Sequence, residues 1–93
     1  MFYIQYDKLA EGKYVVHVQV EPGTWTPSSR REFISRIKKH ARDLNYPLFY
    51  CYIPIEDRKL VKFVELFNFK LMGHEWRKSG FIATYRMNSK CYK

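Results

Sequence analysis

The chain has 93 residues, which is the size of one small domain, and 46% of them are hydrophobic and 18% aromatic. This composition excludes an intrinsically disordered chain, because disordered segments are poor in aromatic and β-branched residues. Seventeen Lys and Arg against nine Asp and Glu give a net charge of +8, which favours an acidic protein or a nucleic acid as partner, although the same excess also keeps a small protein soluble.

The N-terminal part of the sequence predicts a pair of strands. Residues 2–6 alternate apolar and polar side chains, as a strand does, and residues 7–13 contain Gly12 and predict a turn. Residues 14–20 (YVVHVQV) are the clearest strand, with alternate valines on one face and His17 on the other. The next stretch, EPGTWTPS, contains two prolines and a glycine and predicts a loop.

A basic amphipathic helix is predicted to begin at Ser29, which has capping-box spacing with Glu32. Apolar residues recur at helical spacing along one stripe: Phe33, Ile34, Ile37, Ala41 and Leu44. The other faces carry six cations: Arg30, Arg31, Arg36, Lys38, Lys39 and Arg42. The helix is expected to end at residues 45–47, because the residue before a proline avoids helical angles.

The second half of the chain predicts a strand, a helix and a hairpin. Residues 48–53 (LFYCYI) are typical of a strand covered on both faces in a parallel pair. Residues 57–67 predict a helix that ends at Asn68, and residues 69–76 and 81–87 alternate like the arms of a hairpin. The order β-β-α-β-α-β-β indicates an α/β (α+β) domain with a mixed sheet and two helices, in which the second and third strands lie parallel.

The segment FVELFNF at residues 63–69, followed by KLMG at residues 70–73, resembles a segment of the GNAT superfamily of N-acetyltransferases, where a helix ends and the next strand begins. Asn68 stands where the family has glycine, and both residues accept left-handed angles. The resemblance covers roughly residues 14–87 and implies a truncated GNAT-like fold without the family's first strand and first two helices. Compact phage-encoded acetyltransferase-like proteins are similar in this respect.

The resemblance also implies a notch between the parallel strands that contain Val20 and Leu48, beside a loop that holds the pyrophosphate of acetyl-CoA. Family members carry the pattern Q/R-x-x-G-x-G/A there, and its amides lie at a helix N-terminus. The matching stretch here is WTPSSR, in which Pro27 removes an amide and two side chains replace the glycines. The residues implied for the cofactor are Trp25, Ser28, Ser29, Arg30 and Arg31. This mismatch argues against the usual cofactor mode, but the basic helix N-terminus still favours an anion.

The catalytic residues that the resemblance implies are also incomplete. The family's general acid, a tyrosine of the second helix, corresponds to Val64, which has no proton to donate. The family's base corresponds to His17 or Glu21, and histidine is the side chain that changes charge near neutral pH. The favoured interpretation of these two positions is an ordinary histidine on a half-buried strand face and an ordinary loop carboxylate. The histidines and cysteines show no metal-ligand spacing, so no metal is expected.

A separate candidate surface is the basic face of the first helix, formed by Arg36, Lys38, Lys39 and Arg42. Such a face can contact the phosphates of a nucleic acid or an acidic protein, and it is equally typical of a solvated helix. The two tryptophans, Trp25 and Trp76, suit either a binding site or the core.

The remaining features point to one cytoplasmic domain over residues 1–93, with an ordered core at about residues 2–88 and a tail at 89–93. No stretch approaches the ~20 apolar residues that cross a bilayer, the first residues are too polar for a signal peptide, and no membrane association is expected. Cys51 is expected to be a buried thiol and Cys91 to lie in the tail, with no bridge between them.

Three functions follow from these patterns. The first is a GNAT-fold binding or accessory protein of the phage type, whose acyl-CoA loop has degenerated. The second is a minimal acetyl-CoA-dependent N-acetyltransferase that uses His17 or Glu21 as base. The third is a nucleic-acid-binding module that uses the basic helix. The substrate and the oligomeric state stay open.

Overall fold

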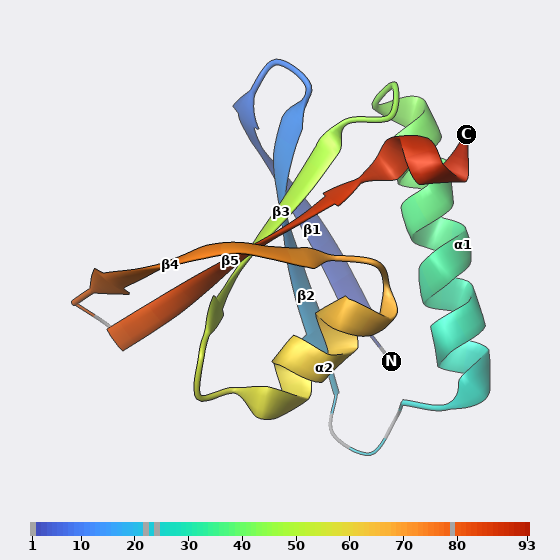
Figure 1. Cartoon of the computed structure of the whole chain (residues 1–93). Helices are drawn as coiled ribbons and strands as arrows, with labels where there is room; N and C mark the ends of the chain where they lie inside the picture. The colour runs from blue at the N-terminus through green and yellow to red at the C-terminus, as the bar shows by residue number, and fades with distance from the viewer. Residues whose placement is uncertain (1, 22, 24, 79) are drawn as a thin grey trace.

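The computed structural model describes residues 2–21, 23, 25–78 and 80–93, and it confirms the predicted order β-β-α-β-α-β-β (Figure 1). In chain order the elements are β1 (Phe2–Ala10), β2 (Lys13–Val20), α1 (Pro27–Asp43), β3 (Leu48–Pro54), α2 (Arg58–Leu66), β4 (Lys70–Arg77), β5 (Gly80–Asn88) and a final 3₁₀ helix, η1 (Ser89–Tyr92). No helix in the described part of the chain is long and apolar enough to cross a membrane.

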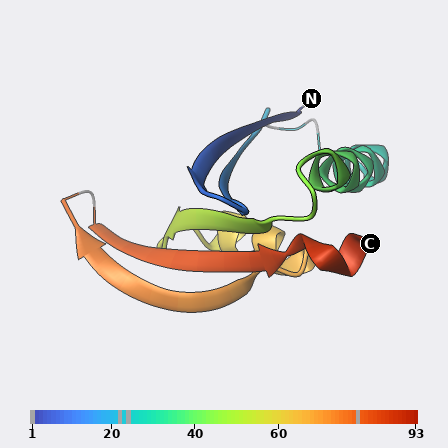
Figure 2. The same ribbon diagram turned by 90° about the horizontal axis from the view of Figure 1, so that it is seen from above.

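The five strands form one mixed sheet in the order β1-β2-β3-β5-β4. Only β2 and β3 pair in parallel within this described sheet, and α1 connects them, as the sequence predicted. Seen from above, the sheet is strongly curved, both helices lie on its inner side, and the β4–β5 hairpin extends away from them (Figure 2). One face of the sheet is therefore covered by α1 and α2, and neither of them covers the other face.

Aromatic side chains fill the space where the two helices meet the covered face. The rings of Phe33 in α1 and Phe67, the C-cap of α2, lie 4.6 Å apart, and the ring of Phe63 in α2 lies 5.3 Å from that of Phe33. Trp25 contacts this cluster from the loop before α1, with its ring 5.1 Å from that of Phe63. Trp25 is thus packed against the core, whereas Trp76 is 78% exposed near the tip of the hairpin, where it stacks on a neighbouring phenylalanine.

The start of α1 differs from the predicted capping box. The helix begins at Pro27, and Thr26 is the N-cap: its hydroxyl oxygen accepts a hydrogen bond from the Ser29 amide at 3.2 Å. Glu32 does not return to Ser29 but pairs with Arg36 one turn later. The physical reason is that proline is favoured at the first helical position, so the sequence Thr-Pro specifies an earlier start than Ser29.

The first hairpin and the C-terminus also differ from the prediction. β1 continues to Ala10, because Asp7 pairs with Val15 in register, and the turn is confined to residues 11–12, where Gly12 has a φ of 74°. Residues 89–93 were expected to be a tail, but Ser89–Tyr92 form η1, which packs against α1. Ser89 is completely buried, and its hydroxyl donates to the Pro47 carbonyl at 2.6 Å.

Other expectations are confirmed. Asn68 has a φ of 68°, so it ends α2 in the left-handed conformation. The helix predicted at residues 57–67 is α2, in which Asp57 is the N-cap and accepts a hydrogen bond from the Leu60 amide. Cys51 is buried, Cys91 is exposed, and both are free thiols.

Candidate functional site

The two parallel strands separate soon after they begin. β2 and β3 pair only from Lys13–Leu48 to Val15–Tyr50, although β2 continues to Val20 and β3 to Pro54. Beyond Val15 the backbone of β2 therefore has no strand partner on the β3 side. One consequence is visible at Val16, whose carbonyl accepts a long hydrogen bond from the Cys51 thiol, with the sulfur 3.6 Å away. This arrangement confirms the expected notch between parallel strands, and Figure 1 shows the two strands diverging toward α2.

A cavity of about 190 Å³ lies in this gap between β2 and β3, with α2 beside it. A second cavity of about 480 Å³ lies between β2, Trp25 and the start of α2. Val18 and Leu60 line both cavities, so the two adjoin each other between the gap and the N-terminus of α2, and together we refer to them as the channel. Its walls are mostly apolar, and the second cavity is also lined by one cation, Lys59, and one carboxylate, Asp57.

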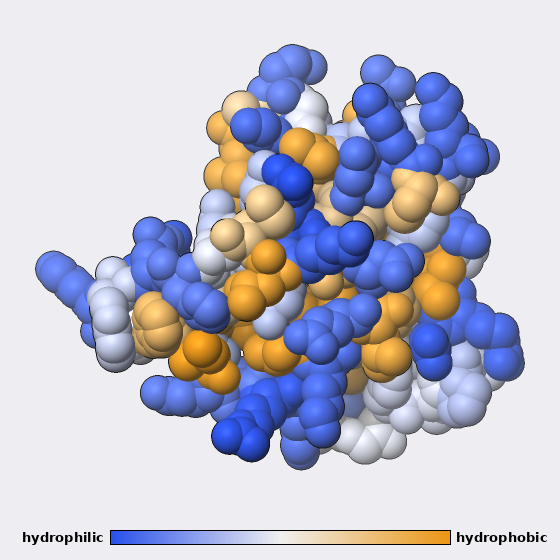
Figure 3. Space-filling view, in the orientation of Figure 1, coloured by the Kyte–Doolittle hydropathy of each residue, from blue (hydrophilic) through white to orange (hydrophobic). Residues whose placement is uncertain are grey.

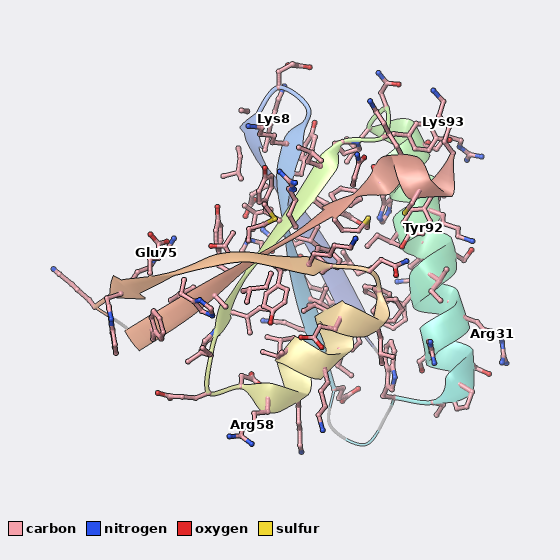
Figure 4. The ribbon with its side chains drawn as sticks, in the orientation of Figure 1. Lys8, Arg31, Arg58, Glu75, Tyr92 and Lys93 are labelled. Carbon is pink, nitrogen blue, oxygen red and sulfur yellow. The ribbon has the colours of Figure 1, made fainter. Side chains whose placement is uncertain are left out.

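Cations lie near the N-termini of the two helices, but Arg30, Arg31 and Arg58 are not among the residues that line the two cavities. Arg31 of α1 and Arg58 at the start of α2 both lie in the lower half of Figure 4. The first turn of α1, which the structure describes in full, holds no acidic residue, and Arg31 donates a hydrogen bond to the Ser28 hydroxyl at 3.2 Å. At the start of α2 the positive end is capped by the Asp57 carboxylate. The excess positive charge therefore lies at the start of α1, where a helix N-terminus also favours an anion.

The sequence-based cofactor residues lie together around the start of α1. Trp25 forms a channel wall, and Ser28, Ser29, Arg30 and Arg31 occupy the first turn. The backbone is less favourable than in a glycine-rich loop: Pro27 has no amide proton, and the Ser29 amide already donates to the N-cap.

Of the two predicted base candidates, only His17 lines the gap. Its Nε2 lies 2.9 Å from Oδ2 of Asp7, and the two side chains are 53% and 58% exposed. Both project from the face of the sheet that α1 and α2 leave uncovered, because Asp7 pairs with Val15, two positions from His17. Glu21 follows the end of β2 and borders a separate shallow pocket. The sequence analysis missed Asp7 because it placed this residue in a turn.

The gap also contains a phenol that sequence reasoning did not single out. Tyr52 of β3 carries the only hydroxyl among the described residues that line the gap, and Arg77 lies over its ring at 5.0 Å. Val64, which corresponds to the family's tyrosine, lines the same gap and is buried. The alternation of LFYCYI contained the signal, because Cys51 points toward the helices and Tyr52 away from them.

Two other polar groups near the gap are held in their neutral forms. Burial raises the pKa of the Cys51 thiol to about 12, so it is not a thiolate nucleophile at neutral pH. Burial, and then the carboxylate of Glu65, raise the pKa of the Tyr85 hydroxyl, which donates to that carboxylate at 3.5 Å.

The four cations of the predicted basic face do not share one surface. Arg36 pairs with Glu32 and lies 4.8 Å from the centre of the Phe2 ring, toward β1. Lys38 instead lies over the ring of Tyr92 on η1. Helical spacing places Arg42 with Lys38, and Lys39 beside them. Among the described residues, no three His, Cys, Asp or Glu side chains form a group that could hold a metal ion.

Solved spermidine N-acetyltransferases have the same arrangement of strands and helices. A single-residue mutant of SpeG from Vibrio cholerae matches 96% of this chain with a TM-score of 0.78 at 15% identity. The chain has a compact GNAT-like fold. SpeG from the same organism in complex with manganese ions gives a TM-score of 0.77 at 15% identity over 96% of the chain, and a chimera of SpeG and hSSAT gives 0.74 at 16% identity over 91%.

The GNAT-like chain spans only 57%, 58% and 55% of the length of these three structures, respectively. No protein-family model and no curated protein sequence matches it. A structural likeness at this level of sequence identity shows the fold alone. Any activity depends on the residues of the gap.

Proposed function

We propose that the chain is a minimal acetyl-CoA-dependent N-acetyltransferase, and that the channel between β2, β3 and α2 holds the acyl donor. The observation that carries this proposal is the early separation of two parallel strands. It opens a channel beside the part of β2 that has no partner in β3, and this channel runs toward Trp25 and Lys59. Solved structures of this fold bear the name N-acetyltransferase, which supports the same activity.

The residues present fit acetyl-CoA in three respects. The β2 backbone beyond Val15 offers amide and carbonyl groups to an extended chain that carries amides of its own. The apolar walls suit the methylene groups of that chain. At the far end, Lys59 lines the second cavity beside the Asp57 carboxylate. The exposed Arg30 and Arg31 at the start of α1 are proposed to supply further positive charge to a pyrophosphate, in place of the amides that Pro27 and the N-cap withhold. When bound, acetyl-CoA supplies an activated acetyl thioester at the gap.

The polar groups at the gap have complementary roles in this proposal. His17 donates its Nε2 proton to Asp7, which leaves Nδ1 to take a proton from the acceptor amine. Tyr52 supplies a proton to the departing sulfur, the role for which Val64 is unsuited. Because His17 and Tyr52 project from the uncovered face of the sheet, the acceptor approaches from that face while the acyl donor lies on the helix side.

The acceptor is proposed to be an amine on a neutral or acidic molecule. The similar solved structures are named for spermidine, a polycation, whereas this chain carries a net charge of +8, which disfavours the approach of a polycation. A panel of amines that contains spermidine, acidic peptides and neutral amines separates these classes.

The proposal is tested by the thermal shift of the chain with acetyl-CoA, followed by turnover of acetyl-CoA on that panel. We expect stabilisation by acetyl-CoA that is reduced in Arg31→Gln and retained in Lys78→Gln, whose side chain lies in the hairpin turn. Turnover is expected to fall in Tyr52→Phe and to persist in Tyr3→Phe, an exposed tyrosine of the same face. The proposal would be overturned if acetyl-CoA did not bind and no amine of the panel were acetylated.

A second candidate is a binding or accessory protein with the same fold. It is favoured by the loss of two backbone donors at α1, through Pro27 and the capped Ser29 amide, and by Val64 in place of a tyrosine. This candidate predicts a folded protein whose melting temperature does not respond to acetyl-CoA.

A further inference from the structure

Two cations face each other across the β4–β5 hairpin. Lys70, the first residue of β4, is the direct cross-strand partner of Arg86 in β5. Like charges in directly opposed positions destabilise a sheet, because their side chains lie side by side on one face. Within the described part of the chain, neither side chain forms an ion pair with a carboxylate. The fold therefore keeps an uncompensated pair of positive charges at this point.

The pair lines a pocket of about 400 Å³ at the corner between β4, β5 and η1. Its polar walls are completed by Asn68 and Asn88, and none of the lining residues is acidic. Asn88 uses its carbonyl oxygen to accept from the Lys90 amide, so its NH₂ group stays available as a donor. Figure 3 shows mainly hydrophilic side chains over this part of the front surface. The pocket thus presents cations and neutral donors to one solvent-open volume.

The chemistry of these walls selects an oxyanion. A guanidinium can donate two parallel hydrogen bonds to a phosphate, and an ammonium adds a point charge, so an anion between the two side chains replaces their repulsion by two attractions. Met72 and Met87 supply an apolar wall beside the charges, and the volume falls in the range of pockets for small molecules. The walls therefore suit a phosphate group attached to an organic body.

This pocket is separate from the channel of the proposed function. The channel is lined by residues of β2, β3, α2 and the loop before α1, whereas the pocket is lined by residues of β4, β5, η1 and the segment before β4. No lining residue is shared between them. The two sites can therefore be tested independently, and the failure of one leaves the other standing.

We propose that the Lys70–Arg86 pocket is a binding site for a phosphate group, carried either by a small phosphorylated metabolite or by a nucleic-acid backbone. The net charge of +8 raises the local concentration of such anions in both cases. The Cys91 thiol lies on the rim of the pocket and provides a place for a spectroscopic label.

The test is a titration of the full chain with inorganic phosphate, adenosine 5′-monophosphate and a short single-stranded RNA, followed through the backbone and Arg side-chain NMR signals. We expect saturable shifts centred on Asn68, Lys70 and Arg86. Lys70→Gln and Arg86→Gln should each weaken binding about tenfold or more, because each removes a charge-assisted hydrogen bond. The matched control, Arg77→Gln, lies in the same hairpin but pairs with Glu75 and should bind like the parent.

The three probes distinguish the source of the phosphate. Saturable binding of the mononucleotide supports a metabolite, and binding of RNA alone, still sensitive to Lys70→Gln, supports a nucleic-acid backbone. Non-saturating shifts with all three probes would overturn the proposal. RNA binding that is insensitive to Lys70→Gln but lost when Lys38, Lys39 and Arg42 are replaced by Gln would also overturn it, and would place the polyanion on α1. Lys70 is exposed, so its variant is expected to fold even where Arg86→Gln does not.

Discussion

The two faces of the sheet are built from the same strands but carry different kinds of side chain. On the covered face, the two helices pack against each other through the rings of Phe33, Phe63 and Phe67. On the uncovered face, the same alternation presents Asp7, His17 and Tyr52 to solvent near the gap. The aromatic core is concentrated on one face, and the residues of the proposed chemistry lie on the other. Substitutions on the covered face should therefore lower the free energy of unfolding, whereas under the proposed function substitutions on the uncovered face should lower activity.

The largest expected effect is on the covered face. Phe33→Ala removes a fully buried ring that touches both α2 and Trp25, and we expect a loss of about 3–5 kcal/mol in the free energy of unfolding. This is a large part of the stability of a domain of this size. Urea denaturation followed by circular dichroism measures it. Tyr3→Ala, on the uncovered face, is the matched aromatic control and should cost less than about 1 kcal/mol.

The next effect concerns activity on the uncovered face. Under the proposed function, His17→Gln should lower kcat/KM for the acceptor amine about a hundredfold, because a positioned general base contributes at least that much. Asp7→Asn should lower it less, since it removes only the group that orients the ring. Steady-state kinetics and urea denaturation of the same samples check both. Equal activity of His17→Gln and the parent would break the assignment of chemistry to this face.

A pH titration examines the covered face through Cys51. Its pKa is 9.0 as an ordinary thiol and about 12 in the fold, because burial disfavours the thiolate. Between these values the unfolded chain releases a proton that the folded chain keeps, so the free energy of unfolding falls as pH rises, by up to about 1.4 kcal/mol per pH unit from this group. Below pH 9 this contribution is fully present.

The slope is measured by urea denaturation at several pH values above 9. Cys51→Ala should decline less steeply than the parent, whereas Cys91→Ala, at an exposed position, should keep the parental slope. Tyrosines also ionise in this range, so the comparison between variants carries the result. Identical slopes in all three proteins would show that Cys51 is not buried as described.

The smallest effect sharpens the comparison at the hairpin. Lys70→Glu places a carboxylate opposite Arg86 and should raise the free energy of unfolding by about 0.2–1 kcal/mol, because opposite charges across a strand pair attract. The same change should abolish phosphate binding. Thermal unfolding at low salt measures the change in stability. A destabilised Lys70→Glu variant would contradict the repulsion between Lys70 and Arg86.

The order of elements was predictable because alternation and helical spacing are local patterns. The parallel pairing of β2 and β3 followed from the helix between them, and the left-handed Asn68 followed from its position after an apolar stripe. The first residue of α1 was harder to predict, because Thr26 and Ser29 both suit an N-cap. Only the proline that follows Thr26 decides between them.

The candidate sites depend on register, which short patterns do not fix. Asp7 meets His17 only because β1 extends past residue 6, and Lys70 meets Arg86 only because a bulge at Met72 shifts the pairing of β4. The burial of Ser89 depends on a carbonyl 42 residues earlier in the chain. Such long-range partners are set by tertiary packing, so the sequence indicated the fold far better than it indicated the sites.

The two tryptophans lie in opposite environments, and this gives the protein a built-in pair of optical reporters. Trp25 forms a wall of the channel and packs on aromatic rings, so its emission should lie toward the blue and respond to whatever enters there. Trp76 stands in water at the end of the hairpin, so its emission should lie toward the red and stay constant. Fluorescence of the unlabelled protein can therefore distinguish occupancy of the channel from a change in the hairpin.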